Sequence, residues 1–105
     1  MIDHKPARYQ RLQHDYPALI AAVETLGDAA QTAGPLDGRV TQLLQLAAAA
    51  AIRSEGAVHS HARRALAEGA TAADIRHALL SITSTVGFPT VTAALSWVDD
   101  VLDRR

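Results

Sequence analysis

The chain of 105 residues contains no cysteine. This absence excludes a disulfide scaffold, a thiolate nucleophile, a cysteine-ligated zinc ion and a dithiol redox cycle. Aromatic residues are also few, at 4%, and β-branched residues are scattered rather than grouped in runs. Since strands are rich in both kinds of residue, the sequence argues against a β-sandwich or a β-barrel.

The sequence also lacks an excess of one charge and a long apolar run. Ten Lys and Arg residues stand against eleven Asp and Glu residues, so the formal net charge is −1. Because no basic excess is present to neutralise phosphates, we expect no nucleic-acid partner. The longest apolar run, 46–52, is far too short for a membrane span, and the first residues contain no apolar stretch like that of a secretory signal. We therefore expect a cytoplasmic protein with no membrane partner.

Alanine and leucine, by contrast, are abundant, at 22 and 12 positions. Both are strong helix formers, and a hydrophobic content of 49% is enough for a packed core. The sequence therefore predicts a single all-α domain over residues 1–105, a compact bundle of five to six helices. Glycines, prolines and capping residues place these helices at about 6–14, 15–33, 37–55, 56–68, 71–86 and 89–103.

Three polar residues are placed to cap helices. Asp15 precedes Pro17, which the first turn of a helix tolerates. Asp37 precedes the third helix, and Thr71 is followed three residues later by Asp74, as in a capping box. Gly56 is expected either to kink one long helix or to separate two helices.

The apolar surface exceeds what a core of this size needs. The run of five alanines at 47–51 leaves one helix with little side-chain bulk, and the last helix is aliphatic. We therefore expect a homo-oligomer, a trimer or hexamer, with residues 47–51 and the face of Ala94, Val98 and Val101 buried between chains.

The densest cluster of ionisable groups lies at 53–64. Glu55, His59 and Arg63 recur every four residues and share one side of a helix, either as a solvated charged stripe or as part of a catalytic group. His61 lies about 200° from His59, on the apolar face. It is either a core histidine with one hydrogen-bond partner or a general acid or base in a recessed pocket. The candidate catalytic residues are therefore His61, Glu55 and His59.

The surroundings of His61 predict its protonation. Its neighbours along the helix are small or apolar, and Arg64 adds a positive charge nearby, so we expect a lowered pKa, a neutral ring at pH 7 and a hydrogen bond through one nitrogen. A metal site formed by Glu55, His59 and His61 is disfavoured. The two histidines point to different sides of the helix, and the pair of Glu55 and His59 lacks a third ligand at an obvious spacing. We expect neither a metal nor a cofactor.

The run HARRALAEGATAADI at 61–75, followed by Gly87-Phe88-Pro89 and an aliphatic helix, resembles the carboxymuconolactone decarboxylase family, which includes the alkylhydroperoxidase D-like proteins. The similarity extends over about 15–102 and includes the turn at 34–38. It implies an all-α fold that commonly assembles as trimers or hexamers, with an active site near the subunit contacts.

The sequence departs from the peroxidase members of that family. Those members carry a Cys-x-x-Cys-x-x-x-His motif and a glutamate further upstream. Here His61 is kept, but Ser54 and Ala57 occupy the two cysteine positions and Gln42 occupies the glutamate position. Because peroxide reduction needs a thiolate that can be oxidised reversibly, the resemblance does not extend to thiol peroxidase activity.

The decarboxylase branch needs no cysteine. The resemblance implies a decarboxylase-type lyase, or an isomerase, that acts on a small unsaturated carboxylic acid or lactone without a cofactor. His61 would transfer the proton, and Arg53 or Arg64 would anchor a substrate carboxylate. Arg53, Arg64 and Phe88 are thus the candidate substrate-binding residues. The alternative is a non-catalytic oligomeric protein, a small-molecule binder or scaffold, that keeps the fold and has a fully packed His61.

Overall fold

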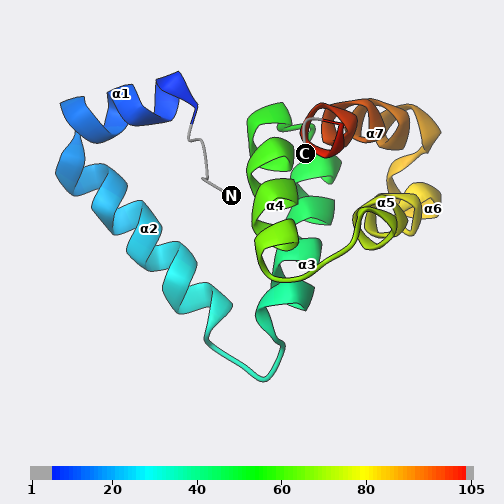
Figure 1. Ribbon diagram of the computed structural model, residues 1–105, viewed down its shortest axis with the longest axis horizontal. Coiled ribbons are helices and arrows are strands. Elements are labelled where there is room, and N and C mark those ends of the chain that lie inside the picture. Colours follow the sequence, from blue (N-terminus) through cyan, green and yellow to red (C-terminus); the bar gives the residue numbers. More distant parts are fainter. Residues whose placement is uncertain (1–5, 104–105) are drawn as a thin grey trace. The chain divides into compact units, whose positions relative to one another are not determined.

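The computed structural model describes residues 6–103, and all regular secondary structure in that range is helical (Figure 1). The all-α prediction is confirmed. The chain divides into two compact units, Met1–Leu36 and Asp37–Arg105, while the single domain over 1–105 stays a prediction. Every helix within 6–103 is too short or too polar to cross a membrane.

The first unit contains two helices, α1 (Ala7–Asp15) and α2 (Pro17–Gln31). Pro17 occupies the start of α2, as predicted, but the cap residue is Tyr16 rather than Asp15. Asp15 instead ends α1, where its carboxylate lies 3.4 Å from the guanidinium of Arg11 one turn earlier. The side chain is therefore engaged within α1, and the prediction that it caps α2 is wrong.

The second unit contains the other five helical segments: α3 (Gly38–Ala51), α4 (Glu55–Ala67), α5 (Ala72–Leu80), the single turn α6 (Thr83–Val86) and α7 (Phe88–Leu102). Helices α3 and α4 form an antiparallel hairpin, and α5 and α7 pack against it (Figure 1). The helix predicted over 71–86 is thus divided, because α5 ends at Leu80 and the chain turns before α6 begins.

The turn between α3 and α4 lies at Arg53, not at Gly56, which is the second residue of α4. Arg53 has a φ of 58°, the left-handed region that glycine usually occupies. Its amide donates to Ala50 O at 2.9 Å, and the amide of Ser54 donates to Ala49 O at 2.9 Å. These two bonds form a Schellman motif with an arginine at the glycine position.

The core of the second unit is aliphatic. Its largest fully buried side chains are Leu46, Ile75, Leu79, Val58, Val91 and Val98. Ala49, Ala50 and Ala94 are buried with them. These alanines and Val98 are therefore covered by the chain's own helices, and the prediction that they lie buried between chains is wrong.

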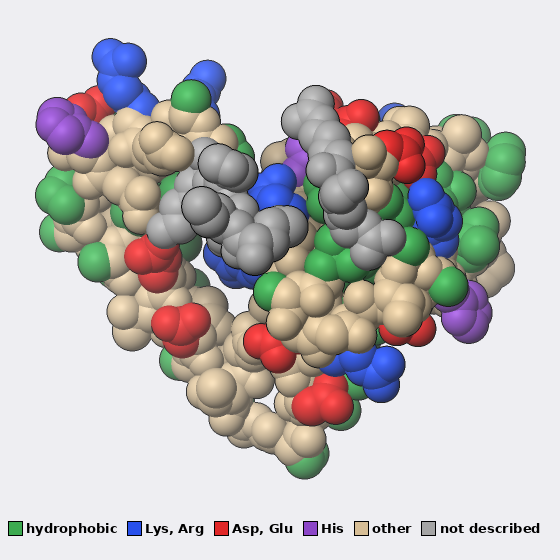
Figure 2. Space-filling view, viewed as in Figure 1, with side chains coloured by type: hydrophobic (Ala, Val, Ile, Leu, Met, Phe, Trp, Pro, Cys, Tyr) green, Lys and Arg blue, Asp and Glu red, His purple; other side chains and the backbone are tan. Residues whose placement is uncertain are grey.

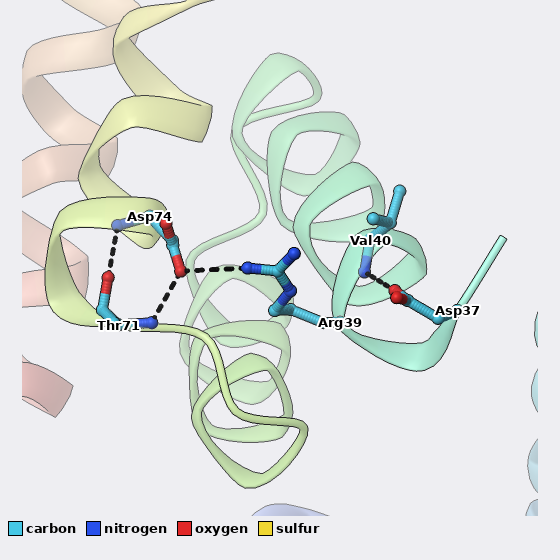
Figure 3. A network of polar contacts seen from close by, with 5 residues as sticks. All are labelled: Asp37, Arg39, Val40, Thr71 and Asp74. Atoms are coloured by element: carbon cyan, nitrogen blue, oxygen red, sulfur yellow. Dashed lines mark hydrogen bonds and ion pairs between the residues drawn. The ribbon is translucent and has the colours of Figure 1, made fainter.

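A polar network fixes the beginnings of α3 and α5 (Figure 3). The Asp37 carboxylate accepts from the Val40 amide at 2.9 Å, which confirms this cap. Thr71 Oγ1 accepts from the Asp74 amide at 3.0 Å, and Asp74 Oδ2 accepts from the Thr71 amide at 2.9 Å, so the capping box is also confirmed. Arg39 Nη1 lies 3.6 Å from Asp74 Oδ2 and thereby connects the two helix starts.

The surface of the second unit carries both signs of charge. On the face in Figure 2, Lys and Arg side chains are interspersed with Asp and Glu side chains, and no block of one sign covers it. Large apolar side chains also stay exposed on this unit: Leu44, Ile52, Leu80 and Phe88.

Candidate functional site

Helix α4 directs its two histidines toward different neighbours. His61 contacts Gln42 of α3, whereas His59 contacts Asp100 of α7. The two rings are two residues apart, and a helix rotates by about 200° over that distance. The sequence prediction that they face different sides is confirmed.

The partner of His61 is a buried amide. His61 Nδ1 lies 2.8 Å from Gln42 Oε1, and Gln42 is only 5% exposed. An amide oxygen can only accept, so this bond places the ring proton on Nδ1 and leaves the lone pair on Nε2. The sequence prediction of a hydrogen bond through one nitrogen is confirmed, and the bond fixes which nitrogen can take up a proton.

The environment of His61 disfavours the imidazolium. Desolvation by burial lowers the pKa of His61, and the positive charge of Arg64, three residues along α4, lowers it further. The neutral partner Gln42 supplies no negative charge that would offset either effect. The predicted lowering of the pKa and both of its predicted causes are confirmed.

The ring of His61 is only partly covered. Val58, Ala62 and Ala65 on the same helix are buried, whereas His61 itself is half-buried. The non-catalytic interpretation expected a fully packed His61, and the structure does not meet that expectation. His61 is therefore partly exposed to solvent within the described residues.

The other two candidate catalytic residues, Glu55 and His59, lie close to each other, and Asp100 of α7 joins them. His59 Nε2 is 3.1 Å from Asp100 Oδ2 and 4.0 Å from Glu55 Oε2. Glu55 and Asp100 are about half exposed, at 57% and 50% of their side chains, and His59 is 24% exposed. Catalytic roles for Glu55 and His59 stay predictions. The contacts of His59 with Glu55 and Asp100 place both residues on the side of α4 that faces α7.

The predicted substrate-binding residues fall in two places. Arg64 is exposed and lies close enough to His61 to influence its pKa. Arg53 instead donates from Nη1 to Thr90 Oγ1 at 2.9 Å, in the first turn of α7. Phe88, the first residue of α7, is 65% exposed. Arg53 and Phe88 are thus associated with the start of α7, and Arg64 with His61.

Sequence reasoning missed two partners. The sequence pattern marks Gln42 only as the position of a missing glutamate. A residue 19 positions before His61 can nevertheless reach it once α3 and α4 form a hairpin. Asp100 lies 41 positions from His59, and no local spacing connects them. Only the packing of α7 against α4 brings Asp100 to the ring.

A protein-family model matches most of the chain. The carboxymuconolactone decarboxylase family matches residues 17–100, which include α2 to α6 and most of α7. Comparisons with curated proteins and with solved structures find no match. The absence of cysteine argues against thiol peroxidase activity. The all-α helices, the retained His61 and the extent of the match lead to one conclusion: the chain belongs to the carboxymuconolactone decarboxylase family.

Proposed function

We propose that the protein is a cofactor-independent lyase or isomerase that acts on a small unsaturated carboxylic acid or lactone, with His61 as its proton-transfer group. The observation that carries this proposal is the hydrogen bond between His61 Nδ1 and Gln42 Oε1 at 2.8 Å. It gives a half-buried ring a fixed orientation and a free lone pair on Nε2, as a general base needs.

A neutral histidine with this tautomer accepts a proton before it can donate one. In an isomerisation, Nε2 would remove a proton from a carbon next to the substrate carbonyl, and the electron pair left behind would delocalise as an enolate. The same nitrogen would then return the proton to the far end of the conjugated system. No net proton is gained or lost, so this reaction suits a ring that starts neutral.

Decarboxylation makes a different demand on the same ring. The bond to the carboxylate carbon breaks, CO₂ leaves, and the delocalised carbanion takes up a proton that the reaction has not itself released. His61 would first have to gain that proton from water, which its lowered pKa disfavours near neutral pH. Of the two reactions, the environment of His61 therefore favours isomerisation.

Substrate recognition in this proposal uses cations. Arg64 would bind a substrate carboxylate near His61, because an exposed guanidinium can form two parallel hydrogen bonds with it. Arg53 and the exposed ring of Phe88 would contribute at the start of α7.

Assembly into a homo-oligomer, a trimer or hexamer, is part of the same proposal. Exposed apolar side chains on the second unit support it, with Ile52 77% and Phe88 65% exposed. Sedimentation at micromolar concentration would give the mass of a trimer or hexamer, whereas a monomer would contradict this part of the proposal.

The experiment uses a panel of unsaturated lactone acids and their open-chain acids. Product formation and CO₂ release are followed with the wild-type protein, His61→Ala and His77→Ala. His77 is an exposed histidine of α5 and serves as the matched control. We expect turnover of at least one compound by the wild type and His77→Ala, and its loss in His61→Ala, with unchanged circular dichroism.

Two results would count against this function. Equal turnover by the wild type and folded His61→Ala would remove His61 from the reaction. Tight binding of an acid without any turnover would instead favour a non-catalytic binding protein.

A further inference from the structure

The second histidine of α4 lies within a cluster of metal-ligating side chains that the proposed function does not use. Glu55, His59 and Asp100 each offer one ligand atom, and these atoms all lie within 4.8 Å of one another. We propose that these three residues form a binding site for a divalent transition-metal ion, with Zn²⁺ as its best-suited occupant.

The geometry is close to that of a coordinated ion. Zinc binds imidazole nitrogen and carboxylate oxygen at about 2.0–2.2 Å, so two ligands in a tetrahedral shell lie about 3.4 Å apart. His59 Nε2 is 3.1 Å from Asp100 Oδ2 and 4.0 Å from Glu55 Oε2. Small rotations of the two exposed carboxylates would therefore suffice to bring all three atoms to one ion.

The fold brings these ligands together. Glu55 and His59 are four residues apart on α4, and that spacing puts their side chains on one face of the helix. Asp100 comes from α7, which packs against α4. The site would join two helices that lie far apart in the sequence, and a bound ion would hold α4 and α7 together.

The chemistry of the donors selects the class of ion. Imidazole nitrogen is a ligand for zinc, copper, nickel and iron, whereas Mg²⁺ prefers a shell of carboxylates and water. Two carboxylates and one imidazole carry a formal charge of −2, which matches a divalent ion. Three protein ligands leave at least one coordination position for water.

A positive charge close to the cluster limits its affinity for a metal ion. Arg63 follows His59 by one turn on the same side of α4 and is half-buried. A positive charge at that spacing opposes the binding of a cation. We therefore expect a site that zinc fills stoichiometrically but that releases the ion readily to a chelator.

The test titrates the full chain with Zn²⁺ at pH 7.5, followed by calorimetry and by the ring signals of the histidines in NMR. We expect one ion per chain, a shift of the His59 ring signals, and a higher Tm that returns to its starting value after chelation. His59→Ala, Glu55→Gln and Asp100→Asn should each weaken binding by about tenfold or more. His77→Ala is the matched control and should bind as the wild type does.

Mg²⁺ serves as the control ion and should leave the His59 signals in place. The proposal is overturned if zinc leaves the His59 signals unmoved, if Glu55→Gln and Asp100→Asn bind zinc as tightly as the wild type, or if Mg²⁺ binds equally well. The two carboxylate variants change only exposed side chains, so we expect them to fold, and circular dichroism would check this. The experiment measures zinc binding and its effect on the protein, not turnover. Its result therefore does not depend on whether the proposed enzyme activity is found.

Discussion

His61 Nδ1 lies 2.8 Å from the side-chain oxygen of Gln42, at the position where peroxidase relatives are expected to carry a glutamate. A glutamate at this distance would stabilise the imidazolium, whereas the neutral amide orients the ring without favouring its charged form. With an amide at this position, the contact leaves the pKa of His61 lowered, as the proposed role of a neutral base requires.

Gln42→Glu tests this relationship. The new carboxylate would lie beside the ring, so we expect the pKa of His61 to rise above its lowered wild-type value. NMR titration of the His61 ring signals measures the change.

Gln42→Leu is the matched control, since it removes the hydrogen bond without adding charge. It should leave the pKa of His61 below the ordinary value of about 6.5. A wild-type His61 with a pKa above the ordinary value of about 6.5 would show that its environment has been misassigned.

The capping box at the start of α5 gives a second prediction. Thr71→Ala removes the hydroxyl that accepts from the Asp74 amide, and we expect the free energy of unfolding to fall by about 1 kcal/mol. Chemical denaturation measures it. Thr92→Ala, at an exposed position inside α7, is the control and should change stability by less than about 0.5 kcal/mol. Equal effects in the two variants would contradict the cap.

The same capping box predicts a dependence on pH. The backbone hydrogen bond from Thr71 is the main cause of a lowered pKa at Asp74. As the pH falls, the Asp74 carboxylate is therefore protonated first in the unfolded chain, near the ordinary aspartate value of about 3.9, and only at lower pH in the folded chain. The stabilising effect is complete above that value and is lost as the pH drops through the lowered one. Asp74→Asn should make the acid-induced loss of stability shallower, and an unchanged slope would contradict this assignment.

The turn at Arg53 gives a reciprocal pair of variants. Gly69, with a φ of 94°, occupies the glycine position of a second Schellman motif at the end of α4, where its amide donates to Leu66 O and the next amide donates to Ala65 O. Arg53→Gly should raise the free energy of unfolding by about 1 kcal/mol, because glycine adopts a positive φ without steric cost.

Gly69→Arg should lower the free energy of unfolding by a similar amount. A Cβ at Gly69 meets no atom within 4 Å, so only the backbone conformation is penalised. Thermal or urea denaturation of both variants checks the opposite signs. If Arg53 anchors substrate as proposed, the stabilised Arg53→Gly variant will also bind substrate more weakly.

Much of the helical architecture follows from local signals in the sequence. Asp37, Thr71 and Asp74 have short-range partners three residues away, so their caps were predictable. The break between α3 and α4 at Arg53 was not predictable, because no sequence pattern indicates an arginine with a positive φ. Gly56 was the more obvious candidate for the turn. The extent of helix α5 was also overestimated, since the apolar spacing continues to Val86 past the turn at Ser81.

The candidate site was predictable only where it depends on one helix. The opposite directions of His59 and His61 follow from helical geometry, and the lowered pKa of His61 follows from its neighbours on α4. The partners Gln42 and Asp100 come from α3 and α7. Their contacts depend on how helices pack, which the spacing of residues along one helix does not encode.

The role of His61 is tested most directly by following the proton that it would transfer. An unsaturated lactone acid is incubated in D₂O with the wild type, His61→Ala or the control His77→Ala. NMR or mass spectrometry then measures deuterium at the carbon next to the carbonyl and at the far end of the conjugated system. We expect deuterium incorporation with the wild type and the control, reduced by about 100-fold or more in His61→Ala. Incorporation at the wild-type rate by folded His61→Ala would contradict this role.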